Sequence, residues 1–468
     1  MVMAFLRSKE EERVIWMALV SRLVTTGLMA IQDGLFEDLS TSAHLQYYPC
    51  NTGNVHEYDS SPTVGYMERL VEEFVPWDGV YFMRIAQCGY ESDQIFAFFP
   101  LLPWLMRGGG WLFGMVYRAL YSVEEKETPM HLVRMVYGLT GVGISMVAFC
   151  GAALSLYRLG LLVVRNKSIV WLSTVLFCWN PASVFYSAVY TESLFAFCTW
   201  TGLVLLEQVQ RIGDGRYWTC IVFFVLASLC RSNGTLAVWF LLHLYVSNML
   251  RGYTPSILAK VKHGIMTCLG CACVCAPYIG MQVYGWMVFC RGQAQQPEWC
   301  QARFPSIYGY IQQKYWDVGF LHFYEKLIRL PFVVQSIPVI ALSVSACWTW
   351  TFFSIQRACT LSLVPFDSAS WYIDRVRGTK QRLEYTSCIL EPRIGPFVYH
   401  LALMTAVATL VMHVNVATRF LSSSPLLFWY LAQRMLNGSA LQQYLIWTWL
   451  FSYIAVGTLL FPNFYPWT

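Results

Sequence analysis

Long apolar stretches separated by short polar connectors run along most of the chain. A helix needs about 20 mostly apolar residues to cross a membrane, and residues 217–250 are long enough for two such spans. Stretches near or above this length cover residues 14–31, 131–157, 168–188, 193–210, 217–250, 264–290, 331–353, 395–413, 420–436 and 443–461. The pattern predicts an all-α polytopic membrane protein of about 9–11 transmembrane helices, organised as one domain over residues 1–468.

Residues 96–120 fit this pattern less well than the other stretches. Aromatic side chains give the segment an apolar face, but Pro100, Pro103, Arg107 and the glycine run 108–110 interrupt it. Proline and glycine favour an interfacial or re-entrant element over a regular span. We therefore expect this segment to lie at the membrane surface.

The composition agrees with a membrane protein and excludes a soluble one. Of 468 residues, 56% are hydrophobic and only 13% are charged, whereas about 25% of the residues of a soluble domain are charged. The formal net charge is only +5 and gives no support to nucleic-acid binding.

The distribution of charge predicts the orientation. Residues 32–94 contain eleven acidic and two basic residues. Most later connectors are basic, and the positive-inside rule places them in the cytosol. We expect the following order along the chain: a cytosolic tail (1–13), a retained first span (14–31), a large first luminal loop (32–130), a transmembrane bundle (131–290), a second luminal loop (291–330), a span (331–353), a cytosolic polar loop (354–394) and C-terminal spans with a luminal end (395–468).

The densest groups of polar and aromatic residues then fall on the predicted luminal side. They include residues 75–82, 96–100, 180–192, 231–233, 296–300, 315–316, 418–424 and 463–468. Charged side chains within or at the ends of spans are costly to bury, so Glu192, Arg231 and Arg419 are candidates for a functional site. Asp78, in the first luminal loop, is a fourth candidate.

Each candidate also has a simpler explanation. Asp78 could be one more solvated acid in an acidic loop, and Glu192 and Arg231 could pair with each other inside the bundle. Interfacial anchoring would explain any one of the luminal tryptophans, which are Trp77, Trp299, Trp316 and Trp467.

The 16 cysteines fall into two groups. Most lie in apolar stretches, including the run at 268–275, where cysteine acts as a small hydrophobic residue rather than a metal ligand. Others, at positions 50, 88, 290 and 300, lie in polar loops. A bridge between Cys290 and Cys300 is compatible with an oxidising lumen, although sequence alone does not fix the pairing.

Other chemistries lack their sequence motifs. The chain has no HExxH, no glycine-rich phosphate loop and no GxSxG, and it has no DxD pair to hold a metal-bound sugar nucleotide. We expect no protein-held catalytic metal. A lipid-linked sugar donor, whose phosphate leaves opposite luminal arginines, suits the acidic, aromatic luminal segments better.

Several luminal motifs, in order over nearly the whole chain, resemble the PIG-V family of endoplasmic-reticulum mannosyltransferases, which have the GT-C architecture. The matching stretches are WDGVYFMRIAQCGY (77–90), FAFFPLLP (96–103), NPASVFYSAVYTESLFAF (180–197), RSNG (231–234), PSIYGYIQQKYWDVGFL (305–321), TRFLSSSP (418–425) and PWT (466–468). The resemblance implies a GT-C-type helical bundle in the endoplasmic-reticulum membrane, with its active site on the luminal side.

The resemblance also implies an activity. Mannose would pass from dolichyl-phosphate-mannose, in α1,6 linkage, to the first mannose of a glycosylphosphatidylinositol (GPI) precursor. A β-phosphate donor and an α product require an inverting single displacement. No cofactor is expected beyond the donor substrate, and the partners would be the two lipid-linked substrates, membrane lipids and a small membrane subunit that some relatives use.

For the site, the resemblance implies Asp78 as the base that accepts the proton of the acceptor hydroxyl, with Glu192 as the second choice or as a residue that orients an arginine. The expected substrate-binding residues are Trp77, Arg231, Asn233, Trp316, Arg419, Ser422, Ser423 and Trp467. Two other functions remain open: a GT-C mannosyltransferase with a different acceptor, and a polytopic lipid or solute transporter. The absence of a visible inverted repeat weighs against the transporter.

Overall fold

The computed structural model describes residues 8–33, 39, 50, 71–121, 130–253, 256–292, 296–353, 358–363 and 392–467. Within these ranges the structure is helical and contains no β-strand, which confirms the all-α prediction. Its α-helices are α1 (Lys9–Asp33), α3 (Asp78–Cys88), α4 (Leu101–Tyr121), α5 (Met130–Val163), α6 (Lys167–Cys178), α7 (Glu192–Leu206), α8 (Gly215–Cys230), α9 (Val238–Leu250), α10 (Ile257–Phe289), α11 (Ile307–Trp316), α12 (Leu330–Phe353), α16 (Gly395–Leu410), α17 (Ala417–Leu421), α18 (Pro425–Asn437) and α19 (Ala440–Leu460).

Several helices are long and apolar enough to cross a membrane. By length and hydropathy, 5 qualify in the described part of the chain: α1, α5, α10, α12 and α19. Shorter apolar helices, α6, α7, α8 and α16, complete the bundle. This confirms a polytopic membrane protein, because each of the long helices spans about 30 Å or more at 1.5 Å per residue.

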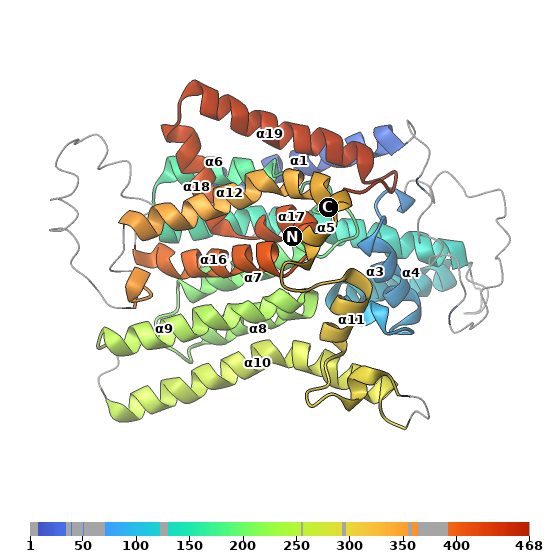
Figure 1. The fold of residues 1–468 in the computed structure, drawn as a ribbon, viewed down its shortest axis with the longest axis horizontal. Coiled ribbons are helices and arrows are strands. Elements are labelled where there is room, and N and C mark those ends of the chain that lie inside the picture. Colours follow the sequence, from blue (N-terminus) through green and yellow to red (C-terminus); the bar gives the residue numbers. More distant parts are fainter. Residues whose placement is uncertain are drawn as a thin grey trace.

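The bundle is centred on α7, which packs between α5 and α8 and buries most of its side chains. The first helix, α1, packs against α5 and the last helix, α19, so the two ends of the chain meet in the bundle. Figure 1 shows α3, α4 and α11 gathered at one end, on the right, whereas the chain passes from α9 to α10 at the other end. The candidate site lies at the end that holds α3 and α11.

The structure corrects the predicted span over residues 168–188. Helix α6 ends at Cys178, and residues 179–191 form a series of turns. Asn180 ends the helix, because its side chain donates to the Phe177 carbonyl and accepts from the Ala182 N–H, each at 2.8 Å. Pro181 follows and cannot continue the helical hydrogen bonds. The turns bring Tyr190 and Glu192 to the end of the bundle.

The structure also shows how two other apolar stretches, 217–250 and 420–436, are divided into helices. Residues 217–250 form two helices, α8 and α9, which a 3-10 helix (Ser232–Ala237) connects, so the expected division is confirmed. The stretch 420–436 is not one helix, because α17 ends at Leu421 and α18 begins at Pro425. Proline is favoured at the first position of a helix, which explains the restart.

Most of the segment at 96–120 belongs to a regular helix, α4 (Leu101–Tyr121), despite its glycines and Pro103, whereas Gln94–Ala97 form a 3-10 helix before it. Pro103 lies in the first turn, where its missing N–H costs no hydrogen bond. A Cβ atom at Gly109 would lie 2.5 Å from Thr140, and one at Gly110 would lie 2.1 Å from Tyr137. The glycines therefore allow α4 to pack closely against α5.

A charged residue in a span, such as Arg22, is expected either to extend to the interface or to pair near its span. The structure shows the second arrangement, because Arg22 is fully buried on α1. Its guanidinium donates to the Ser183 and Cys178 carbonyls at 2.7 and 2.9 Å and to the Ser187 hydroxyl at 3.0 Å. Arg22 therefore ties α1 to the turns that precede Glu192.

Two disulfides lie in the segments predicted to be luminal. The Cys290–Cys300 bridge is confirmed, and a second bridge joins Cys50 to Cys88 at the end of α3. The cysteines at 268–275 are free thiols on α10. Most of the predicted cytosolic loop 354–394 lies outside the described residues.

Candidate active site

A cavity of about 460 Å³ opens at the end of the bundle that holds α3 and α11. The segments that meet around it are far apart in the sequence: the start of α3, the start of α7, the turn after α8, α11 and the residues before α17. Its polar and aromatic lining residues include Trp77, Asp78, Tyr190, Glu192, Arg231, Asn233, Tyr308, Gln312, Trp316, His413, Asn415 and Arg419. A cavity of this size holds a sugar with part of a phosphate.

Asp78 is the first residue of α3 and is held from two sides. Its backbone N–H donates to the Tyr190 hydroxyl at 3.0 Å, and that hydroxyl donates to the Pro76 carbonyl at 3.0 Å. Its carboxylate accepts from Arg419 Nη1 at 2.6 Å. A negative charge in the first turn of a helix is favourable, which also suits Asp78 to this position.

The residue before Asp78 has an unusual backbone. Trp77 has a φ of 55°, a conformation that side-chain-bearing residues rarely adopt. Its indole Nε1 is buried and has no hydrogen-bond partner in the described part of the chain. Strained backbone and unpaired polar atoms concentrate at functional sites, because there the surrounding structure holds a geometry that local preferences disfavour.

Glu192 links the two candidate arginines. Its Oε1 lies 2.5 Å from Arg231 Nη1 and 3.6 Å from Arg419 Nη1. The predicted pairing of Glu192 with Arg231 is thus confirmed. Because Glu192 is only 1% exposed, removing its charge would leave two mostly buried guanidinium groups short of a counter-ion, a change that typically costs about 3–5 kcal/mol.

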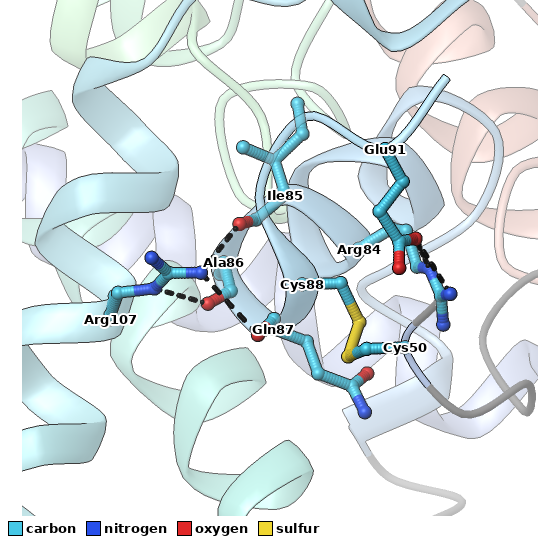
Figure 2. The surroundings of a disulfide bond; sticks show 8 residues. All are labelled: Cys50, Arg84, Ile85, Ala86, Gln87, Cys88, Glu91 and Arg107. Atoms are coloured by element: carbon cyan, nitrogen blue, oxygen red, sulfur yellow. Dashed lines mark hydrogen bonds and ion pairs between the residues drawn. A yellow bond between two sulfur atoms is a disulfide. The ribbon is translucent and has the colours of Figure 1, made fainter. Parts of the chain in front are cut away.

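The far end of α3 is fastened independently of the cavity. Figure 2 shows Arg107, on α4, directed at the last carbonyls of α3, and it donates to Ala86 at 2.8 Å and to Ile85 at 3.3 Å. The Cys50–Cys88 disulfide holds the same end, and an ion pair of 2.7 Å joins Arg84 to Glu91 beside it. These contacts fix α3, and with it the position of Asp78.

Most of the predicted site residues meet in the cavity, and three do not. Those that line it are Trp77, Asp78, Glu192, Arg231, Asn233, Trp316 and Arg419. The carbonyls of Ser422 and Ser423 instead accept from Tyr186 and Trp200 in the core. Trp467 packs against Tyr453, also outside the lining.

Four polar lining residues were not singled out by the sequence: Tyr308, Gln312, His413 and Asn415. None of them is charged or belongs to a motif with a recognisable spacing, so nothing distinguishes them from ordinary loop or helix positions. Tyr308 shares a hydrogen bond of 2.8 Å with Ser232 across the cavity wall. The stretch 305–321 pointed to the right helix and to Trp316 on it, but not to Tyr308 and Gln312.

The described residues offer little to hold a metal ion. Among them, the one group with suitable spacing is Cys50, Cys88 and Glu91. Its two cysteines form a disulfide with each other, so their thiolates are not available as ligands.

Comparison with known proteins agrees with the motifs. The family model described as mannosyltransferase (PIG-V) matches residues 9–468. GPI mannosyltransferase 2 from Drosophila pseudoobscura pseudoobscura is 30% identical, across 84% of this chain and 86% of the relative. GPI alpha-1,6-mannosyltransferase 2 from Homo sapiens is 30% identical, across 78% of this chain and 74% of the relative. No solved structure gives a significant match. A family match over nearly the whole chain, together with one membrane-embedded bundle around a charged cavity, shows that the chain belongs to the PIG-V mannosyltransferase family.

Proposed function

We propose that this enzyme adds the second mannose of the GPI core, in α1,6 linkage, from dolichyl-phosphate-mannose to the first mannose of the GPI precursor. The names of the relatives support the acceptor and the linkage. A donor with a membrane-bound lipid tail suits a cavity at the end of a transmembrane bundle. The proposed location is the lumen of the endoplasmic reticulum, and two disulfides near the cavity support it because such bonds persist in oxidising compartments.

The observation that carries the proposed mechanism is the difference in exposure between the two carboxylates. The Asp78 side chain is 28% exposed at the cavity, whereas that of Glu192 is 1% exposed. A general base has to reach the hydroxyl whose proton it accepts. Asp78 is therefore the base, and Glu192 orients Arg231 and Arg419.

The reaction is a single in-line displacement. Asp78 accepts the proton of the acceptor 6-hydroxyl as its oxygen bonds to the mannose C1. The bond between C1 and the phosphate oxygen breaks, and the electron pair leaves with the phosphate. Arg231 and Arg419 stabilise that negative charge, and Trp77 and Trp316 stack against sugar rings. One displacement inverts C1 and needs no covalent enzyme intermediate.

The alternatives make different predictions for the acceptor. A related enzyme with another lipid-linked or protein-linked acceptor would use the same donor and the same residues, so only the acceptor distinguishes it. A transporter would move the lipid without forming a glycosidic bond. A small membrane subunit remains part of the proposal as a component that the assay has to supply.

The test is an assay of microsomes that lack the endogenous activity and carry this chain with labelled dolichyl-phosphate-mannose and a GPI precursor bearing one mannose. We expect a two-mannose product. Asp78→Asn should lower the rate by about 10²–10⁴-fold, the usual contribution of a general base. Asp93→Asn is the matched control, because Asp93 lies outside the cavity lining and pairs with exposed Lys314.

Each failure has its own meaning. If folded wild-type protein, with candidate subunits supplied, forms no two-mannose product, the proposed acceptor is wrong. Product formation by Asp78→Asn at the wild-type rate would remove Asp78 as the base and leave the overall reaction in place.

A further inference from the structure

The three residues His413, Val414 and Asn415 form a wall of the cavity for which the proposed chemistry has no use. His413 and Asn415 line the cavity, while the Val414 side chain between them is fully buried. The Val414 carbonyl accepts from the Ser336 hydroxyl of α12 at 2.6 Å. This bond anchors the backbone from behind and leaves the two polar side chains on the cavity side.

Both side chains carry a buried polar atom without a partner. His413 Nε2 and Asn415 Oδ1 have no hydrogen bond in the described part of the chain. The His413 ring packs against the Phe323 ring, with centroids 5.0 Å apart. Buried polar atoms are almost always paired, so unpaired atoms beside a cavity point to a ligand that pairs with them.

The chemistry of this wall differs from that of the arginine side. Arg231 and Arg419 carry the cationic groups and suit a phosphate. The wall instead offers an imidazole and an amide, with the Gln312 amide and the Trp316 ring also in the lining. Amides, imidazoles and an aromatic surface can pair with hydroxyl groups and cover the apolar face of a sugar.

We propose that His413 and Asn415 bind hydroxyl groups of a mannose in the cavity and thereby determine sugar specificity. This inference rests on the proposed function, since it assigns part of the same cavity to the sugar rather than to the phosphate. The hydroxyl groups belong either to the transferred mannose of the donor or to the acceptor mannose. Both sugars offer the same chemistry, so the experiment has to separate them.

The experiment measures KM and kcat separately for donor and acceptor in the microsomal assay, with wild type, Asn415→Ala and His413→Gln. We expect KM for one of the two substrates to rise about tenfold, because losing one hydrogen bond weakens binding by about that factor. KM for the other substrate should stay within about twofold of the wild-type value. The substrate whose KM rises is the source of the hydroxyl. Asn437→Ala, at the exposed end of α18 and away from the cavity, should match the wild type.

Monodeoxy analogues of that substrate then locate the hydroxyl. With the analogue that lacks the bound hydroxyl, wild type and variant should turn over at the same rate, because the bond is absent from both. The proposal is wrong if neither KM changes. It is also wrong if the rate of each variant is lower than that of the wild type by the same factor with every analogue. His413→Gln keeps the test decisive if Asn415→Ala does not fold. Turnover of the unmodified substrates by the wild-type protein tests the proposed function separately, so that function stands whatever the variants show.

Discussion

Arg419 is the residue on which the arrangement of the cavity depends. It contacts Asp78 at 2.6 Å and lies 3.6 Å from Glu192. A guanidinium presents several donors in a fixed plane, so one arginine can hold the base and still face a phosphate. In the described cavity lining, two arginines and two carboxylates balance each other. A phosphate that enters therefore has to share guanidinium groups that are already paired.

Glu73 provides a prediction about pH. It lies in the segment before α3, is 5% exposed and has one carboxylate oxygen without a partner in the described structure. Burial and the nearby Asp33 raise the pKa of Glu73 from 4.5 to about 7. The folded protein therefore holds a proton that the unfolded chain has already lost, and its stability should fall as the pH rises from 4.5 to about 7.

Glu73→Gln should remove this dependence, because glutamine keeps the shape without the charge. Thermal unfolding in detergent between pH 5 and 8 would show the variant above the wild type at the alkaline end, with the difference shrinking toward pH 5. Glu298→Gln, at an exposed position, should follow the wild type. A variant that parallels the wild type at every pH would show that Glu73 stays charged in the folded protein.

At the scale of elements, the sequence predicted most helices and few of their ends. The apolar stretches are set by the membrane, so α1, α5, α10, α12 and α19 appear where the hydropathy places them. The errors lie at the end of the bundle that holds the cavity, where the Asn180 side chain and buried hydroxyl groups replace helical hydrogen bonds with turns. Those turns depend on partners far away in the chain, which local pattern does not show.

The site was predictable to the same degree. Charged residues at the ends of spans are expensive, so Glu192, Arg231 and Arg419 stood out and do meet. Burying an uncharged side chain such as that of His413 or Asn415 carries no comparable free-energy cost, so the sequence did not predict these two residues. Ser422 and Ser423 lie next to Arg419 in the sequence, but the end of α17 turns them into the core.

Helix α3, which begins with the proposed base Asp78, gives a second prediction. Arg107→Ala removes the donors to the Ala86 and Ile85 carbonyls and should destabilise the protein by about 1.5–3 kcal/mol, the usual value for charged hydrogen bonds. We expect kcat to fall about tenfold with little change in KM, because Asp78 shifts while the arginines stay in place. Unfolding curves and steady-state rates measure the two effects.

Arg107→Lys is the informative companion, since one ammonium reaches fewer carbonyls than a guanidinium and should restore only part of the loss. Arg303→Ala removes an exposed cation of the predicted second luminal loop and serves as the control. Unchanged kcat in a destabilised Arg107→Ala protein would limit Arg107 to a structural role.

At the scale of the whole molecule, the proposed orientation can be tested with glycans. The chain contains N-x-S sequences at Asn166 and Asn437, both at the end of the bundle opposite the cavity, and an N-x-T sequence at Asn233, which lines the cavity. Glycans are added only in the lumen, so Asn166 and Asn437 should remain unmodified. The double substitution Gln301→Asn with Arg303→Thr creates a new N-x-T sequence at exposed positions in the predicted second luminal loop.

We expect that double variant to carry one more endoglycosidase-sensitive glycan than the wild type in microsomes. Removing the native N-x-S sequences with Ser168→Ala and Ser439→Ala should leave the mobility of the wild type unchanged. A glycan on Asn166 or Asn437 would reverse the orientation of the bundle and move the cavity to the cytosol.

The burial of Arg22 also has a consequence for how the protein is made. Its partners Ser183 and Ser187 lie 161 and 165 positions further along the chain. When the ribosome releases α1, none of these groups exists, and a lone guanidinium near the middle of a nascent span opposes insertion. We therefore expect α1 to take its final position in the bundle only after α6 and the turns that follow it have been synthesised. The placement of the first span then depends on a much later segment, the turns that lead into Glu192.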